Sequence, residues 1–146
     1  MKALIQRVSR ADVTIAGTTA GRIQKGMLVF LGVEKGDTEK DLAHIVKKVI
    51  SLRIFYDSEG RMNLSVKDIG GEVLVVSQFT LAADCRKGNR PSFDKAETPD
   101  KAKAMYEQAI ALIGREGITV ASGEFAADMQ VSLVNDGPVT FLLDSR

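Results

Sequence analysis

The sequence is poor in the residue types that most metal and triad sites require. Its 146 residues include no tryptophan, one cysteine (Cys85) and one histidine (His44). Because zinc sites draw on several Cys and His ligands, we expect no metal and no cofactor. A Ser-His-Asp triad would have to use His44, and nothing in the sequence brings it near Ser77 or Thr80. Cys85 has no neighbouring histidine that could activate it as a nucleophile.

The sequence also lacks long apolar runs and a set of cysteines. One cysteine excludes an internal disulfide framework and fits a reducing cytosol. No run of about 18 apolar residues is present, so neither a membrane span nor a membrane partner is expected. Residues 1–7 carry charges inside an apolar stretch and show no cleavage-like site, which is not typical of a signal peptide. We therefore expect a cytoplasmic protein.

Neither sign of charge dominates the chain. It has 20 basic and 19 acidic residues and a net charge of +1. Bulk electrostatics therefore do not indicate a nucleic-acid-binding protein, and any RNA contact has to come from a local patch. We expect no DNA partner. The length and the 45% share of apolar residues predict a single domain over residues 1–146.

The hydrophobic pattern predicts many short strands and two helices. One helix is expected over 39–51, and a second begins at Pro99 after the N-cap residue Thr98 and ends at Gly114 or Gly117. Strands are expected at 2–8, 12–16, 27–33, 53–56, 73–79, 118–120, 130–134 and 139–143, and a turn with a short strand is expected between Gly17 and Gly21. No Gly-rich phosphate loop is present. This pattern predicts an α+β fold with mainly antiparallel or mixed sheets rather than a Rossmann fold.

Two short stretches carry the polar residues of greatest interest. Ser77-Gln78-Phe79-Thr80 ends the apolar strand that begins at Val73, which places hydroxyls, an amide and backbone N–H groups at a sheet edge. Asn135 to Thr140 lies between two apolar runs and reads as a turn between strands. A plain hairpin turn is one interpretation. A cis Gly137-Pro138 bond, with two carbonyls directed to one side to grip an ammonium or N–H group, is the other.

Together, Ser-Gln-Phe-Thr at 77–80 and Asn-x-Gly-Pro-Val-Thr at 135–140 resemble the two signature motifs of the D-aminoacyl-tRNA deacylases, the D-tyrosyl-tRNA(Tyr) deacylase family. The resemblance extends over nearly the whole chain, including 4–8, 32–34, 62–64 and 125–129. It implies a barrel-like pair of sheets with the helices outside, and a homodimer. It also implies hydrolysis of the ester bond of D-aminoacyl-tRNA, with rejection of L-aminoacyl-tRNA.

The resemblance further implies roles for the first motif. Ser77, Gln78, Phe79 and Thr80 would border the ester carbonyl and the terminal adenosine, with the Phe79 N–H as a donor to the ester oxygen. Thr80 has also been viewed in this family as a nucleophile. Because a hydroxyl nucleophile needs a base and none is evident, we favour main-chain positioning, assisted by the 2′-hydroxyl of the tRNA.

The second motif would recognise the amino acid. Gly137 and Pro138, joined by a cis bond, would enter the partner subunit's pocket, with their carbonyls toward the substrate's amino group. An L side chain would collide with this wall, whereas glycine would fit, so glycyl-tRNA, including glycine mischarged on tRNA-Ala, is an expected second substrate. Arg7 would hold the loop in place. Asn135 and Met129, which lie in matching segments, are assigned to substrate binding.

A basic loop follows the first motif. Residues 84–98 contain Arg86, Lys87 and Arg90, which we predict to bind the tRNA backbone. The alternative is a flexible basic loop without a ligand. Two other functions stay open: an esterase of small molecules with Thr80 or Ser77 as nucleophile, and a non-enzymatic nucleic-acid-binding module that depends on this loop.

Overall fold

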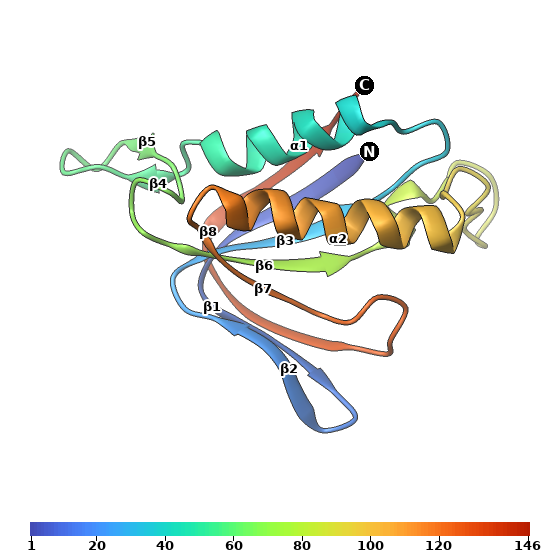
Figure 1. Ribbon diagram of the computed structural model, residues 1–146, viewed down its shortest axis with the longest axis horizontal. Coiled ribbons are helices and arrows are strands. Elements are labelled where there is room, and N and C mark those ends of the chain that lie inside the picture. The colour runs from blue at the N-terminus through green and yellow to red at the C-terminus, as the bar shows by residue number, and fades with distance from the viewer.

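The computed structural model describes all residues, 1–146, and consists of a mixed main β-sheet with two helices on one face and a small separate hairpin sheet (Figure 1). The elements in chain order are β1 (Lys2–Ile15), β2 (Thr18–Ile23), β3 (Gly26–Gly32), α1 (Glu39–Ser51), β4 (Phe55–Tyr56), β5 (Met62–Leu64), β6 (Glu72–Ser77), the 3-10 helix η1 (Phe79–Ala82), α2 (Pro99–Arg115), β7 (Thr119–Ser122) and β8 (Gln130–Asp144).

The main sheet is mixed and nearly closed into a barrel. Its strand order is β2-β1-β3-β6-β7, and β8 pairs with β1. β1 is antiparallel to β2, β3 and β8, whereas β3–β6 and β6–β7 are parallel. β2 returns against β7, where Gly21 faces the backbone of Ser122 so closely that a side chain would not fit. The predicted α+β class, the mixed barrel-like sheet and the two outer helices are confirmed.

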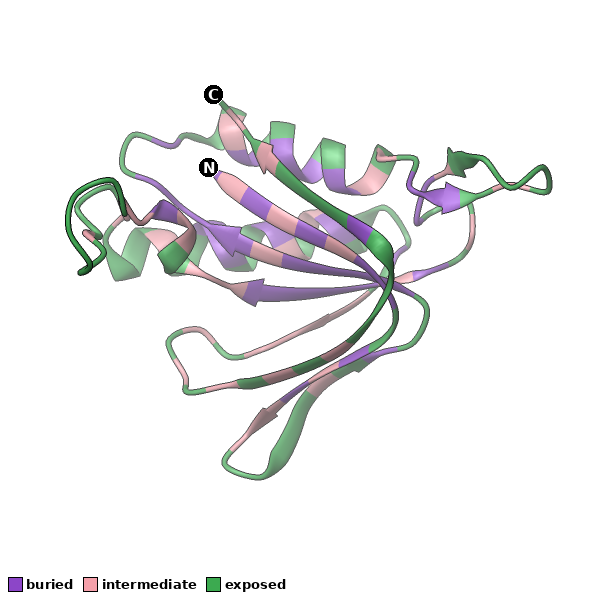
Figure 2. Cartoon of the chain, turned by 180° about the vertical axis from the view of Figure 1, so that it is seen from behind, coloured by how far each residue is buried: buried purple, intermediate pink, exposed green.

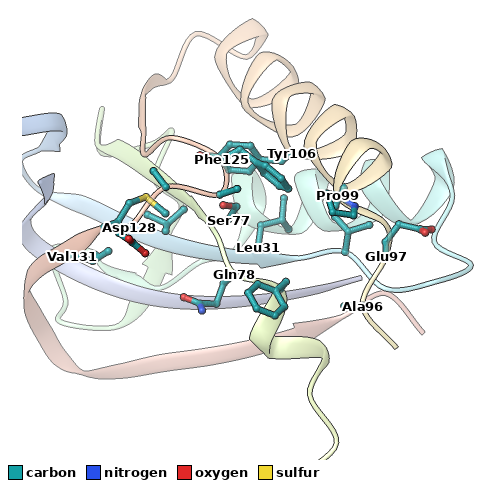
Figure 3. Close-up of a pocket in the computed structure, with 17 residues that line it drawn as sticks. Leu31, Ser77, Gln78, Ala96, Glu97, Pro99, Tyr106, Phe125, Asp128 and Val131 are labelled. Carbon is teal, nitrogen blue, oxygen red and sulfur yellow. The ribbon is translucent and has the colours of Figure 1, made fainter. Parts of the chain in front are cut away.

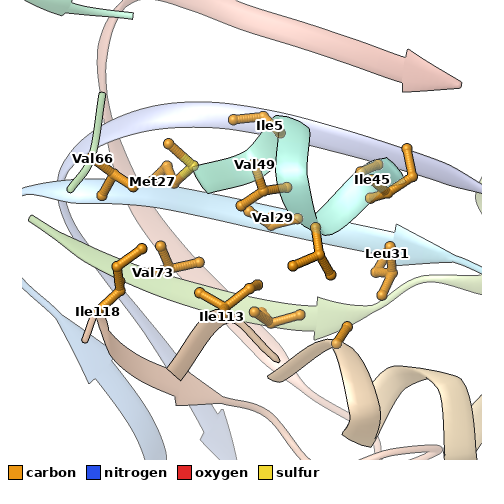
Figure 4. Close-up of a cluster of buried hydrophobic side chains, with 14 of the residues drawn as sticks. Ile5, Met27, Val29, Leu31, Ile45, Val49, Val66, Val73, Ile113 and Ile118 are labelled. Atoms are coloured by element: carbon orange, nitrogen blue, oxygen red, sulfur yellow. The ribbon is translucent and has the colours of Figure 1, made fainter. Parts of the chain in front are cut away.

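Both faces of the central strands are buried (Figure 2). Between the helices and the sheet lies the larger core, to which Ile45, Val49 and Ile113 contribute from the helices (Figure 4). The smaller core, inside the curved sheet, includes Leu28 and Leu74. A strand covered on both faces is apolar throughout rather than alternating, which is the pattern that predicted β3. Neither helix combines the length and the apolarity that crossing a bilayer requires.

Two pairs of predicted strands are in fact single long strands. The stretches 2–8 and 12–15 belong to the continuous β1, with Ala16 already in the following turn, and 130–134 and 139–143 belong to the continuous β8. The hairpin turn expected at Asn135–Thr140 is therefore wrong. In the pairing with β1, Val8 is opposite Asn135 and Gln6 is opposite Thr140. The chain between them bulges out of the ladder opposite Arg7, because β1 runs past it unbroken and keeps β8 paired on both sides.

The remaining boundaries differ by small amounts. α1 has its predicted bounds, and α2 begins at Pro99 and runs through Gly114 to Arg115. Gly117 lies beyond the helix with φ +80°, the left-handed conformation that commonly follows a helix. The strand predicted over 73–79 ends at Ser77, so that Phe79 and Thr80 belong to η1 instead.

Candidate functional site

A cavity of about 550 Å³ opens where β3 and β6 end (Figure 3). These two strands are parallel and pair Leu31 with Ser77, so their carboxyl ends meet at the same edge of the sheet. Ligands of sheets with parallel strands commonly bind outside this edge. The start of α2 and the segment Phe125–Met129 form the remaining walls. Most of the lining residues are apolar, so the cavity suits a ligand with a flat or apolar part.

The first motif lies at the rim of this cavity. Ser77, Gln78 and Phe79 line it, whereas Thr80 does not. The Gln78 N–H donates to the Leu31 carbonyl (2.8 Å), which holds the chain at the sheet edge. Phe79 is the first residue of η1, so its N–H has no acceptor within that helix.

The hydroxyl of Thr80 has an amide as its side-chain partner. The Gln78 Nε2 donates to Thr80 Oγ1 at 2.6 Å. An amide nitrogen cannot accept a proton from a hydroxyl, so this contact orients Thr80 without activating it as a nucleophile.

Tyr106 and Phe125 form the aromatic wall of the cavity. Their ring centroids are 6.0 Å apart. The Tyr106 hydroxyl donates to the Val75 carbonyl at 2.9 Å, which ties α2 to β6. Burial raises the pKa of Tyr106 to about 12, so its hydroxyl stays a donor throughout the neutral range.

Met129 is the one residue of the predicted substrate-binding set that reaches this cavity. It closes the wall beside Phe125, and its sulfur covers Gly123, where a side chain would collide with it. Ala126, between them, has φ +63°, a left-handed conformation that is uncommon for a residue with a side chain. The tight turn at Ala126 folds the segment back over the cavity.

The bulge of β8 lies outside the cavity and is anchored by Arg7. The Gly137–Pro138 peptide bond is cis in the structure. Arg7 is 3% exposed, and its Nε donates to the Asp136 carbonyl at 2.8 Å. Its Nη1 donates to the Ile54 carbonyl at 2.6 Å, and its guanidinium lies 4.5 Å above the ring of Tyr56.

Asn135 closes the same bulge from its other side. Its Nδ2 donates to the Arg7 carbonyl at 2.9 Å and to the Val139 carbonyl at 3.1 Å. The side-chain amide thereby replaces ladder hydrogen bonds that the bulge interrupts. Both side chains are thus hydrogen-bonded to the protein's own backbone, Arg7 from a buried position and Asn135 from an exposed one.

Within one chain the two motifs stay apart. In the strand register Arg7 pairs with Met27, which pairs with Val73, and Ser77 lies further along the same strand. β8 is separated from β6 by β1 and β3. At the usual spacings this places the bulge roughly 13 Å along the strands and roughly 14 Å across the sheet from Ser77.

The basic loop divides into paired and unpaired cations. An antiparallel bridge between Asp84 and Ser92 closes the loop. Arg86 is hydrogen-bonded and ion-paired to Asp84, which lowers the pKa of Asp84 and raises that of Arg86. Lys87 and Arg90 are exposed and form no ion pair within the chain. Of the three cations predicted to bind phosphate, Arg86 therefore has part of its charge balanced already.

The structure contains no group of three or more His, Cys, Asp or Glu residues that could hold a metal ion.

Several residues around the cavity and the bulge are not predicted by any sequence motif. The sequence predicts no role for Tyr106 in the apolar wall of the cavity, and Phe125 is included only in the segment 125–129 that resembles the family. Tyr56, beneath Arg7, and Phe93, beside Phe79, were not identified either. One signal was available, because Tyr106 is the only aromatic residue of α2 and sits on its apolar stripe. The exposed aromatic residues gave no periodic signal.

Comparisons with known proteins define the family. A model of the D-Tyr-tRNA(Tyr) deacylase family matches residues 4–144. The D-aminoacyl-tRNA deacylase of Geobacter sulfurreducens is 58% identical over 146 residues, covering 100% of this chain and 96% of that protein. The D-aminoacyl-tRNA deacylase of Thermotoga petrophila is 59% identical over 145 residues, covering 99% and 97%.

Two solved structures share the fold. The structure of a "c-Myc DNA Unwinding Element Binding Protein" has a TM-score of 0.94 and 41% identity, covering 100% of this chain and 99% of the other. The structure of "a probable eukaryotic D-amino acid tRNA deacylase" has a TM-score of 0.84 and 17% identity, covering 97% of each chain. The protein is an enzyme of the hydrolase class that acts on ester bonds. It belongs to the D-Tyr-tRNA(Tyr) deacylase family, as the two motifs predicted.

Tyr106 provides a test of the cavity wall through its titration. The chain has two tyrosines, so a Tyr56→Phe variant leaves Tyr106 as the only one. We expect its tyrosinate absorbance to appear only near pH 12. Because the folded pKa exceeds the usual value of 10.0, the contribution of Tyr106 to stability is complete below pH 10 and is lost as the pH rises toward 12. Titration of folded protein near pH 10 would contradict the buried hydroxyl.

Arg7 provides a test of the bulge. Arg7→Leu leaves the Asp136 and Ile54 carbonyls without their donor, so we expect the free energy of unfolding to fall by about 1–3 kcal/mol. Arg10→Leu on the same strand is the control, since Arg10 is exposed, and its effect should stay within about 0.5 kcal/mol. Urea denaturation of both variants measures the difference. Equal effects would show that Arg7 does not anchor the bulge.

Proposed function

We propose that the protein hydrolyses the ester bond between a D-amino acid and the 3′ end of tRNA, releasing the free amino acid and tRNA. The observation that supports this most directly is the Ser77–Thr80 motif at the rim of the cavity, in a chain matched to the family over residues 4–144. Its relatives in Geobacter sulfurreducens and Thermotoga petrophila carry the name D-aminoacyl-tRNA deacylase. Glycyl-tRNA, including glycine mischarged on tRNA-Ala, is the second proposed substrate.

In this proposal the cavity receives the terminal adenosine. Its volume of about 550 Å³ and its aromatic wall of Tyr106 and Phe125 suit a nucleoside. The Phe79 N–H donates to the ester carbonyl oxygen, where negative charge develops during attack by water. The bond from the carbonyl carbon to the ribose oxygen then breaks, and that oxygen takes up a proton.

The protein's main contribution is positioning rather than covalent catalysis. Thr80 Oγ1 has the Gln78 amide as its partner and no base within hydrogen-bond distance. The 2′-hydroxyl of the tRNA, adjacent to the reacting ester, supplies the polar assistance that the side chains lack. Holding a substrate in the geometry of attack can by itself accelerate a reaction greatly.

A homodimer completes the site in this proposal, with Gly137–Pro138 of one subunit in the cavity of the other. The bulge is held rigidly by Arg7 and Asn135, and β8 has a free edge because it pairs only with β1. Val134, Phe141 and Leu142 on β8 are exposed apolar residues. Natural proteins rarely leave a long, apolar edge strand uncovered. The Gly137 and Pro138 carbonyls would then accept from the substrate's amino group, and an L side chain would collide with the bulge.

The decisive experiment compares two substrates that differ only in chirality. We expect the protein to release tyrosine from D-tyrosyl-tRNA and to leave L-tyrosyl-tRNA intact, because the wall formed by the bulge admits one configuration. Release is measured after chelation of transition metals, with magnesium present to keep the tRNA folded. Equal rates on the two substrates would refute chiral selection. Loss of activity on chelation, with recovery on addition of zinc, would refute the metal-free chemistry.

A non-enzymatic nucleic-acid-binding function is the second candidate. The structure that is 41% identical to this chain carries the name of a DNA unwinding element binding protein. The exposed Lys87 and Arg90 would serve contact with either RNA or DNA. Binding to DNA without release of an amino acid from D-tyrosyl-tRNA would favour this alternative.

The basic loop can be tested through the salt dependence of tRNA binding. Replacing Lys87 and Arg90 with alanine should lower the slope of log affinity against log salt by roughly 0.7–0.9 for each phosphate that the loop no longer neutralises. The control is Lys40→Ala with Lys47→Ala, which removes the same charge from the exposed face of α1. Arg86→Ala should have a smaller effect, since Asp84 already balances its charge. An unchanged slope in the loop variant would show that the loop does not contact the phosphates.

A further inference from the structure

Two phenylalanines are exposed side by side at the rim of the cavity. Phe79 is 58% exposed and Phe93 is 40% exposed. Their ring centroids are 5.0 Å apart and their planes are inclined by 60°. Aromatic rings are costly to leave in water, and paired exposed rings commonly mark a binding surface. Neither ring of the Phe79–Phe93 pair belongs to either hydrophobic core.

The pair lies between the cavity and the cations of the loop. Phe79 lines the cavity, and Phe93 directly follows the bridge between Asp84 and Ser92 that closes the loop. Lys87 and Arg90 lie within this loop, about three residues from its base, which is a reach of roughly 10 Å. A single nucleic-acid strand that leaves the cavity over the rings would therefore bring its phosphates near unpaired positive charge.

We propose that the Phe79–Phe93 pair is a stacking platform for the base of the nucleotide that precedes the terminal adenosine. This rests on the proposed function, in which the adenosine occupies the cavity. The two rings are tilted rather than stacked face to face, and both remain substantially exposed, so ring surface is available to a base. Every base has a π-face, and a groove that combines aromatic platforms with cations is how proteins hold single strands.

The charge around the rings favours a nucleotide over a second copy of this chain. Asp84 is already paired with Arg86, and the unpaired charges nearby are those of Lys87, Arg90 and Lys95 against the single carboxylate of Asp94, so the loop carries a net positive charge. Two such loops brought together across an interface would repel each other. The ribose-phosphate chain that follows a stacked base is negative and suits the same surface.

Three substrates of increasing length test the platform. They are the D-tyrosyl esters of adenosine, of the dinucleotide cytidylyl-adenosine, and of tRNA. In Phe93→Leu, which keeps an apolar side chain but removes the π-face, kcat/KM should fall roughly 5- to 150-fold on the dinucleotide and on tRNA. It should not change on the adenosine ester, which has no base to stack. Phe93→Tyr keeps the ring and should retain the wild-type values on all three.

A binding measurement tests stacking without catalysis. The probe is the dinucleotide with a fluorescent cytosine analogue in the first position and no amino acid attached. Wild-type protein and Phe93→Tyr should quench the probe, and Phe93→Leu should not. This readout stands even if the protein releases no amino acid, so failure of the proposed function is distinguished from failure of the platform.

Three results would overturn the proposal. An equal loss on the adenosine ester would show that Phe93 supports the cavity itself. Unchanged kinetics on all substrates, with unchanged quenching, would show that no base stacks there. A Phe93→Leu variant that dissociates in sedimentation, with no change in quenching, would assign the rings to an interface between copies of the chain.

Discussion

Strand β1 is hydrogen-bonded along both edges, and this double pairing determines where the bulge forms. On one edge β1 pairs with β3 as far as Val8 and with β2 from Ala11 onward. On the other edge β8 follows it over nearly its whole length, with register shifts on both sides of Val8. The shifts therefore occur where β1 passes from one partner to the next. A bulge sharpens the local bend of a strand, so the Gly137–Pro138 bulge lies at the corner that the sheet has to turn.

The parallel pairing of β3 with β6 places the first motif in the same way. At the start of the pair, Gly26 lies so close to the Glu72 backbone that a side chain would overlap it. At the other end the pairing stops at Ser77, and the chain turns into η1. β6 ends there while the start of α2 and the Phe125–Met129 segment continue over the edge, which leaves the cavity open above the strand ends. The position of Ser77 thus follows from the sheet rather than from contacts of its own side chain.

Much of the fold could be predicted from the sequence, because local signals are strong where burial is complete. The apolar run of β3 and the stripe of α1 with Leu42 and Ile45 gave the elements within a residue or two. The long strands could not be predicted, because Asn, Asp, Gly and Pro at 135–138 are as typical of a bulge as of a turn. What distinguishes the two is the unbroken partner strand, which is a tertiary property. The motif residues of the candidate site were predicted from the family resemblance. Tyr106 and Phe125, in contrast, have the sequence pattern of ordinary core residues, and they become walls of the cavity only through the packing of α2.

The ionisable groups at the rim indicate what kind of chemistry the cavity can support. Glu97 and Asp128 are its only charged lining residues. Glu97 accepts from Lys101 and from the Thr98 N–H, and the Lys101 contact lowers its pKa. A carboxylate with a lowered pKa is a weaker base, so Glu97 is poorly suited to activate water. Asp128 is exposed at the outer margin.

A site without a strong base has to act through geometry, and backbone groups held by a sheet edge are the most rigid donors available to it. The side chains of the motif can then have other roles. The Gln78 amide orients Thr80, and the Phe79 ring packs beside Phe93 at the rim.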